Sequence, residues 1–421
     1  MERFAITLAE AGQTGSMSLD ARQQCECILR QISGVQQREF DGTWRSRSLE
    51  CGAQADLADH LPARTRITAL LPESGPLLDA GQIVNEHRFL IAAINALNLA
   101  DWQFQFRIKK NRRLVVDRSG RVNLSRFDHF SVTVRFRIKS GSAHLEVGEG
   151  NIAGFKFNQS GLSQRIGELV SSQRRMKRMV FPDPLPVILQ AGEGGILFHE
   201  ILGHSLEADY VCRGVSPFSP ADLGKMIVSQ PMNLTTRDPN DPFFAGCQGD
   251  DEGEKAATDQ LIEDGCLQTF ISDLSHSQQL KLAGGGHCRC EDFSRLPQPR
   301  TYALYVRPGA FEAGEILQQT RRGILAREFG AATIDFHRDR FSFIIHEAHL
   351  VEAGKVTAPL GSVTVSGGIR QTLNQVTMIG NDFRYDRGVS YCLKNGQLVN
   401  VRVGQPTIRI DGLSVSQGKN D

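Results

Sequence analysis

Two histidines and a glutamate lie within one short stretch, His199-Glu200-Ile201-Leu202-Gly203-His204. Neutral imidazoles are common zinc ligands, and a carboxylate beside them can take the proton from a zinc-bound water. The stretch follows a glycine-rich run, 192–195, which would let two backbones approach closely beside such a site. These residue types predict a hydrolytic zinc centre in which His199 and His204 bind the metal and Glu200 is the general base.

The spacing of the two histidines is one residue longer than in the common H-E-x-x-H zinc motif. In a regular α-helix, residues five positions apart point about 140° away from each other, so they could not share one ion. A π-bulge would bring the two side chains together, and Gly203 is a suitable place for such a distortion. We therefore expect a deformed helix; the alternative is a helix with two unconnected histidines.

A catalytic zinc usually has three protein ligands and an open position for water, so a third ligand is needed. Spacing alone does not identify it, because contacts between distant parts of a chain leave no local pattern. The candidates with suitable side chains are Glu207, Asp209 and Cys212 nearby, and Cys247, Cys392 and the segment 287–290 farther along the chain.

Two other segments have metal-binding residue types. His346-Glu347-Ala348-His349 ends an apolar run that is typical of a strand, in which the two histidines would face opposite sides. His287-Cys288-Arg289-Cys290 has soft ligands, but their spacing is too tight for one tetrahedral ion, and three glycines precede it. We expect a strand at the first segment and a turn at the second.

The composition excludes several classes of partner. With 48 basic and 47 acidic residues the formal net charge is +1, so no overall field favours nucleic acid or an anionic membrane. No apolar stretch is long enough to span a membrane, and the first residues do not form an ordinary secretory signal. The nine cysteines include no C-x-x-C pair and should be reduced thiols. We expect a soluble, cytoplasmic protein.

The chain is predicted to have an α+β fold in two domains, because 421 residues exceed the size of a single core. Residues 1–180 should form an N-terminal α+β domain with an antiparallel sheet. Residues 185–421 should form a mostly antiparallel β domain, curled towards a barrel, that carries the metal-binding helix. The three prolines within 181–186 mark the boundary between them.

Local patterns predict the individual elements. Helical spacing of apolar residues predicts helices over 19–32, 81–99, 161–179 and 311–325, and an irregular segment over 53–75. Alternation of apolar and polar residues from 104 to 139, around a turn at 117–120, predicts antiparallel strands. Further strands are expected over 186–189, 301–306, 341–345, 361–365, 397–403 and 407–411.

Several segments, in chain order, resemble the motifs of one protein family. The segment 194–209 resembles the H-E-x-x-x-H helix of the TldD/PmbA metallopeptidases. The further matches are 250–253 to D-D-E-G, 296–300 to L-P-x-P-R, 378–382 to M-x-G-N-D, 392–397 to C-G-K-x-G-Q and 403–407 to V-G-Q-P-T. The resemblance covers residues from about 110 to about 412, and the order of its motifs makes coincidence negligible.

The resemblance implies a third ligand and a partner. In TldD-type subunits the metal is held by the two motif histidines and by the cysteine that corresponds to Cys392, while Glu207 would orient a histidine. The family also implies a homodimer, or a heterodimer with a PmbA-like subunit that lacks H-E-x-x-x-H. The intact motif places this chain on the catalytic side. Leu393, Ala303 and Glu254 depart from the family pattern, which leaves substrate choice and subunit pairing open.

The residues and the resemblance together imply a zinc-dependent peptidase that hydrolyses short or unfolded peptides, laid in the site as an added strand. One alternative is a dedicated maturation protease that trims a modified precursor peptide, a role the family also takes. Another alternative is a non-catalytic, metal-bound scaffold subunit. Cleavage of mixed unfolded peptides, of one precursor only, or of no peptide would separate the three.

Overall fold

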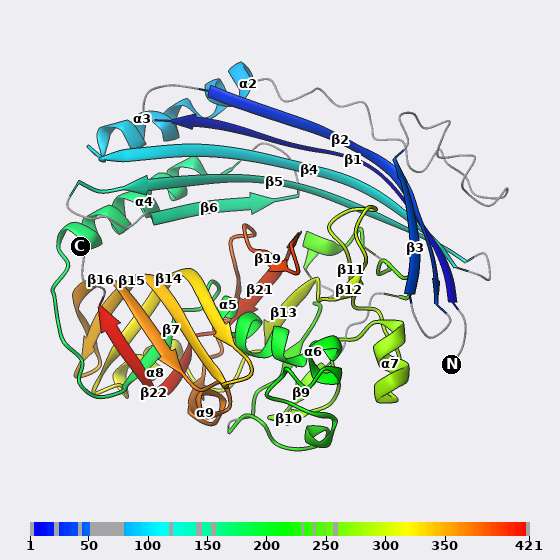
Figure 1. Ribbon diagram of the computed structural model, residues 1–421. Helices are drawn as coiled ribbons and strands as arrows, with labels where there is room; N and C mark the ends of the chain where they lie inside the picture. Colours follow the sequence, from blue (N-terminus) through cyan, green and yellow to red (C-terminus); the bar gives the residue numbers. More distant parts are fainter. Residues whose placement is uncertain are drawn as a thin grey trace.

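The structure is a computed structural model, shown in Figure 1. The predicted irregular segment 53–75 and most of the predicted turn at 117–120 lie outside the residues that it describes. It describes residues 4–20, 25–40, 44–50, 80–117, 121–139, 145–152, 157–229, 231–238, 241–247, 249–255 and 260–417.

A six-stranded antiparallel sheet forms the N-terminal layer and curves over the rest of the molecule (Figure 1). Its order is β3-β2-β1-β4-β5-β6. The strands are β1 (Phe4–Asp20), β2 (Cys25–Phe40), β3 (Trp44–Glu50), β4 (Asp101–Asp117), β5 (Val122–Arg137) and β6 (Leu145–Asn151). The predicted alternation is confirmed in β5, where Val134 and Phe136 are buried and Arg135 between them is exposed.

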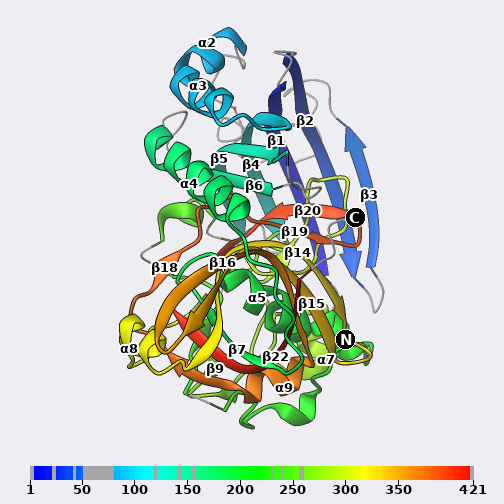
Figure 2. The ribbon, with the colours of Figure 1, turned by 90° about the vertical axis from the view of Figure 1, so that its left-hand side faces the viewer.

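Three helices cover one face of this sheet at one end (Figure 2). They are α2 (Ala80–Glu86), α3 (Arg88–Ala96) and α4 (Gln159–Arg174). Leu90 of α3 and Ile166 of α4 pack with Phe104 of β4 in one apolar core. The predicted helices over 81–99 and 161–179 are therefore observed, the first split into α2 and α3 and the second shorter than expected.

The predicted helix over 19–32 is wrong. Leu19 lies at the end of β1, and residues 25–32 belong to β2. β1 pairs along its length with β2 on one side and with β4 on the other, and Met17 and Leu19 are buried in the core of the sheet. Helical spacing is a weak local signal, and here pairing with two neighbouring strands outweighs it.

Five strands close into a barrel in the C-terminal half (Figure 2). Around the barrel they are β16 (Lys355–Gly367), β15 (Arg340–Glu352), β14 (Arg322–Asp335), β7 (Leu185–Leu189) and β22 (Ile408–Gln417). β22 pairs with β16 and closes the ring, and β14 runs parallel to β7. Val187, Ile345 and Val363 contribute to its apolar core. The prediction of a mostly antiparallel sheet curled into a barrel is confirmed.

A second six-stranded sheet, in the order β10-β9-β8-β13-β21-β18, accompanies the barrel. Its strands are β8 (Leu234–Thr235), β9 (Gln260–Glu263), β10 (Cys266–Leu267), β13 (Ala303–Val306), β18 (Arg384–Tyr385) and β21 (Arg402–Gln405). Two small antiparallel pairs stand apart: β11 (Cys288–Arg289) with β12 (Gln298–Pro299), and the hairpin of β19 (Tyr391–Lys394) with β20 (Gln397–Asn400). The hairpin lies beneath the N-terminal sheet (Figures 1 and 2).

The remaining elements are short. They include α6 (Ala208–Cys212), α7 (Leu274–Leu280), α8 (Ala313–Gln318), α9 (Ile369–Asn374) and the strand β17 (Val376–Ile379), which extends the barrel sheet beside β22. Among the helices of the described ranges, none is long and apolar enough to cross a membrane.

Three local predictions have different outcomes here. The helix over 311–325 is correct only for α8, because Arg322 already begins β14, whose pairing with β7 and β15 builds the barrel. The turn over 287–290 is wrong, since two of its residues form β11 and pair with β12. The strand expected at 346–349 is confirmed as part of β15. Both misses lie where pairing with another strand decides the conformation.

A row of buried and partly buried charges joins α4 to the barrel. Nε of Arg165 in α4 donates to the carboxylate of Glu328 in β14 at 2.7 Å, and the same guanidinium contacts Glu347 of β15. Arg387 bridges Glu328, at 2.5 Å, and Glu193, at 3.0 Å. Because Glu328 is buried and faces both arginines, loss of both cations would leave a buried charge unpaired, at a cost of about 3–5 kcal/mol. The row therefore fixes the N-terminal layer against loops that precede the 195–206 helix and β19.

His129 of β5 makes a second link between the layers. Its Nε2 donates to the carbonyl oxygen of Gly388 at 2.9 Å, and its Nδ1 accepts from the side-chain amide of Asn400 at 3.3 Å. The amide donor assigns the ring proton to Nε2. Burial lowers the pKa of His129 to about 4. The neutral ring is therefore the form that this interface accommodates.

We expect His129 to make the folded protein sensitive to acid. Its pKa is about 4 in the fold against an ordinary value of 6.5. Its contribution to stability is therefore complete above pH 6.5 and decreases by about 3 kcal/mol as the pH falls to 4. Between pH 7 and pH 5, the melting temperature of His129→Gln, which can still donate to Gly388, should fall by less than that of the wild type. The exposed His337→Gln is the control, and equal losses for His129→Gln and the wild type would contradict the assignment.

Candidate metal centre

Residues 195–206 form one continuous but irregular helix. It begins as α5 (Gly195–Phe198), widens into a π-helical turn, η2 (His199–Gly203), and ends as a 3-10 turn, η3 (His204–Leu206). The backbone N–H of His204 donates to the carbonyl oxygen of His199, five residues earlier. The predicted distortion is confirmed, and it leaves the two imidazole ring centres 5.0 Å apart at an interplanar angle of 75°.

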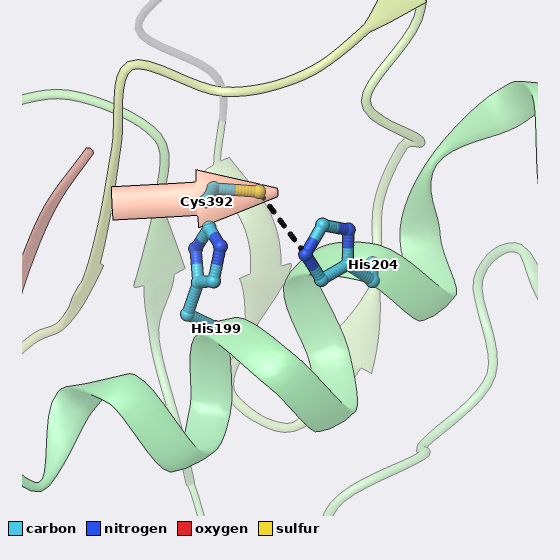
Figure 3. Close-up of side chains that lie close together, drawn as sticks. All are labelled: His199, His204 and Cys392. Atoms are coloured by element: carbon cyan, nitrogen blue, oxygen red, sulfur yellow. Dashed lines mark hydrogen bonds between the residues drawn. The ribbon is translucent and has the colours of Figure 1, made fainter. Parts of the chain in front are cut away.

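Cys392 reaches these rings from the hairpin strand β19. Its Sγ lies 3.2 Å from Nε2 of His204 (Figure 3). One ligand atom from each of His199, His204 and Cys392 lies within 4.8 Å of the other two. All three side chains are buried. The structure thus brings together the three residues that were expected to hold a metal.

Close backbone contacts hold the start of the helix against the second sheet. Gly192 has a φ of 101°, which glycine adopts most easily. A Cβ on Gly195 would lie only 2.9 Å from the backbone nitrogen of Gly404 in β21. The close approach that the glycine-rich run suggested is therefore present.

Gly203 has a different role from the one expected. Its φ of −51° and ψ of −59° are ordinary helical values, so its backbone does not require glycine. A Cβ there would lie 3.5 Å from Nδ1 of His199 and 3.5 Å from Cδ2 of Leu304, an ordinary contact distance. The glycine therefore leaves room for the His199 ring, and a side chain larger than alanine would press on it.

The site favours the thiolate form of Cys392. Burial alone would raise the pKa of this thiol, but the imidazoles of His204 and His199 outweigh burial and hold the pKa well below its usual value. Burial alone would likewise lower the pKa of His204, but Cys392 and Glu207 raise it well above 6.5. Since the thiolate is the form of cysteine that binds metals, the electrostatics of the site suit a metal ligand.

His199 gives the clearest sign that the three residues fit a metal. Neither of its ring nitrogens has a hydrogen-bond partner within the described chain, although the side chain is buried. A buried polar atom without a partner costs about 1–3 kcal/mol. Two imidazole nitrogens and a thiolate form a donor set that suits zinc. An ion between the three side chains would also give His199 its partner.

A buried carboxylate lies behind His204. Oε2 of Glu207 is 3.0 Å from Nδ1 of His204, which leaves Nε2 of that ring to face Cys392. Lys394 places its Nζ 2.9 Å from the same Glu207 oxygen and 2.7 Å from Asp209. Burial would raise the pKa of Glu207, but Lys394 and His204 lower it to about 2. Glu207 is therefore an ionised acceptor, which suits the orienting role expected of it.

Glu200 differs from its neighbours on the π-helical turn. It is partly exposed, whereas His199 and Ile201 on either side are buried. Its carboxylate makes no hydrogen bond to any residue that the structure describes. It therefore lies next to a candidate ligand, with a side chain that solvent can reach.

The other candidate ligands do not complete this site. Glu207 and Asp209 are ion-paired with Lys394, and Cys212 lies partly exposed on α6. Cys247 is buried elsewhere, with its thiol 3.9 Å from the carbonyl oxygen of Arg126.

One other set of side chains in the described chain could approach an ion. Single ligand atoms of Glu252, Asp273 and Cys288 lie within 4.8 Å of one another. However, Glu252 already accepts from the backbone N–H of Leu274 at 2.8 Å, and Asp273 caps α7 by accepting from the N–H of His276 at 2.8 Å. These contacts account for both carboxylates as structural groups.

Two buried cations of the site were not singled out from the sequence. Lys394 pairs with Glu207, and Arg300 donates to the backbone carbonyl of Cys392. Both lie in segments that carry the family resemblance, and that was the only signal available, since a functional lysine or arginine has no distinctive local spacing.

The chain resembles known proteins in sequence. Residues 182–417 match the family model described as the PmbA/TldA metallopeptidase C-terminal domain. The chain is 33% identical over 230 residues to the metalloprotease TldD homolog of Buchnera aphidicola subsp. Schizaphis graminum, which covers 55% of this chain and 47% of that protein. It is 29% identical over 293 residues to the zinc metalloprotease TldD homolog of Saccharolobus solfataricus, covering 68% and 64%.

Solved structures show the same fold. TldE from Thermococcus kodakarensis matches 99% of this chain and 97% of its own with a TM-score of 0.72 and 15% identity. A protein from Thermotoga maritima matches 98% and 96% with a TM-score of 0.74 and 16% identity. By sequence, the chain spans about half the length of the first curated relatives it matches. Because the family model covers more than half of the chain and includes His199, His204 and Cys392, this chain belongs to the TldD/PmbA metallopeptidase family.

Proposed function

We propose that this chain is a zinc-dependent peptidase in which His199, His204 and Cys392 hold the metal. The observation that carries the proposal is the convergence of these three buried side chains, with a thiol that favours its ionised form and with the His199 imidazole making no hydrogen bond to the described residues. Three protein ligands of this kind would leave one position of a tetrahedral zinc open, as catalysis requires.

The chain's own residues would then divide the work. A zinc ion held there would supply a Lewis acid for the scissile carbonyl and for the attacking water. Glu200 would accept the proton of that water and deliver it to the leaving amine, a transfer for which its partial exposure and unengaged carboxylate are suited. Glu207 would fix the tautomer of His204 by accepting from Nδ1.

Two further parts of this proposal concern the substrate and the partner. We propose short or unfolded peptides as substrates, and a dimer either with a second copy or with a PmbA-like subunit. A dedicated maturation protease for one modified precursor remains the second candidate, and a metal-bound scaffold subunit the third. Digestion of a pool of unfolded peptides, with and without the partner, tests them together: broad cleavage supports the first, and no cleavage by a zinc-loaded protein supports the third.

Glu200→Gln should keep the metal and lose the reaction. The amide cannot accept the proton, so cleavage of an unfolded peptide should fall by about 10²–10⁴-fold, while zinc content stays near one per chain. Peptide digestion followed by mass spectrometry, together with metal analysis, measures both. Glu168→Gln, a change at an exposed glutamate of α4, is the matched control. Wild-type cleavage by a zinc-loaded Glu200→Gln protein would rule out the assigned general base.

Cys392→Ala should lose zinc. Because the thiolate is one of three proposed ligands, affinity should fall by more than the roughly 10–100-fold that loss of an outer partner causes. Zinc content after dialysis against a chelator measures the effect. Cys247→Ala removes another buried thiol outside the site and should retain zinc like the wild type. Equal zinc retention in the two variants would show that Cys392 is not a ligand.

Substitutions at Gly203 should separate backbone from side-chain effects. Gly203→Ala adds a methyl group at ordinary contact distance and should bind zinc within a few-fold of the wild type. Gly203→Leu extends towards the His199 ring and should weaken zinc binding at least about tenfold, because close-packed surroundings give way little. Equal zinc binding by Gly203→Ala and Gly203→Leu would show that zinc binding does not require the space beside the His199 ring.

A further inference from the structure

The hairpin β19–β20 rests on the segment 296–300, one of the segments that resemble the family's motifs. The side-chain amide of Gln397 donates to the carbonyl oxygen of Leu296 at 2.9 Å. The side-chain amide of Gln298 donates to the carbonyl oxygen of Lys394 at 3.2 Å. Two segments that are far apart in the sequence thus fit together, and one of them carries the thiol of the metal site.

Arg300 connects the segment 296–300 to both strands of the hairpin. Its two terminal nitrogens donate to the carbonyl oxygens of Gln397, at 2.9 Å, and of Cys392. The side chain is 1% exposed. In the described part of the chain it forms no ion pair, and its Nε has no partner. Burying a cation without a counter-charge is costly. The two carbonyl contacts are therefore the interactions that compensate for the burial of this guanidinium.

The contact with Cys392 bears directly on the position of the thiol. The carbonyl that Arg300 holds and the Sγ that faces His204 belong to the same residue. A zinc–sulfur bond of about 2.3 Å tolerates errors of only about 0.2 Å, so a small shift of the β19 backbone would remove the ligand from reach. Arg300 also spans the hairpin, because Gln397 lies on β20.

Lys394 anchors the same strand from the helix side. It lies two residues after Cys392, on the same face of β19, and its Nζ pairs with Glu207 at 2.9 Å. It also donates to the carbonyl oxygen of Pro299 at 3.0 Å, so it touches both the 296–300 segment and the helix side of the site. The hairpin is thus fixed on two sides by buried cations.

We propose that Arg300 is a positioning residue for the metal site, whose guanidinium holds the Cys392 carbonyl so that the thiol faces the two histidines before a metal binds. The inference rests on the proposed function only in taking His199, His204 and Cys392 as ligands. It requires no particular substrate, and it concerns metal binding, not cleavage.

The test measures metal binding by the full chain. Arg300→Gln should bind Zn²⁺ about 10–100-fold more weakly in competition with a chromophoric chelator, the range found when an outer partner of a ligand is lost. When Co²⁺ replaces Zn²⁺, the thiolate-to-metal charge-transfer band of Arg300→Gln should be weaker than that of the wild type. Arg300→Lys keeps the charge but not the planar fork, and should recover part of the affinity and of the band.

A matched control separates positioning from general stability. Arg237 also donates to two backbone carbonyls, those of Phe244 and Cys247, and does not touch the hairpin. Arg237→Gln should lower the melting temperature without changing Zn²⁺ affinity or the Co²⁺ band.

Wild-type Zn²⁺ affinity and an unchanged Co²⁺ band in Arg300→Gln would overturn the proposal. If Arg300→Gln does not fold, Arg300→Lys decides: weaker Zn²⁺ binding at a normal melting temperature supports the proposal, and unchanged binding overturns it. A wild type that shows the thiolate band but cleaves no peptide, either alone or with a PmbA-like partner, would refute the proposed peptidase and leave this inference standing.

Discussion

The approach of the Cys392 thiol to the His204 imidazole is the contact on which the rest of the site depends. Sγ of Cys392 and Nε2 of His204 are 3.2 Å apart, although the two residues are 188 positions apart in the chain. A buried thiolate is stable only if donors or positive charge face it. The π-helical turn supplies them by turning His199 and His204 to the same side, and the glycine contacts with β21 hold that helix in place.

A set of ion pairs links the two elements that carry the proposed ligands to the rest of the fold. Glu193 precedes the 195–206 helix, and Arg387 precedes β19; the two side chains form an ion pair at 3.0 Å. Arg387 continues to Glu328 of the barrel, and Glu328 to Arg165 of α4. The loops that lead into both halves of the site are therefore tied to each other and to the N-terminal layer. Such paired charges contribute definite geometry more than net stability.

The sequence predicted what local chemistry and periodicity determine. The H-E-x-x-x-H spacing predicted the π-helical turn because one extra residue between two ligands has few structural solutions. Alternation predicted β4 and β5 of the N-terminal sheet and parts of the barrel strands. It did not predict the strand conformation of residues 19–20, 25–32 and 322–325, which pairing with other strands decides. Cys392 was identified as the third candidate ligand from the family resemblance alone. The contacts by which Arg300 and Lys394 hold β19 could not be predicted from the sequence, because they involve backbone carbonyls and distant side chains that leave no local pattern.

We propose that one zinc ion binds between His199, His204 and Cys392. X-ray absorption at the zinc edge of the purified full chain tests this most directly. We predict about one zinc per chain with a single sulfur at about 2.3 Å and nitrogen ligands at about 2.0–2.1 Å. A bound zinc surrounded only by nitrogen and oxygen, or a protein that binds no zinc at micromolar concentrations, would contradict the account.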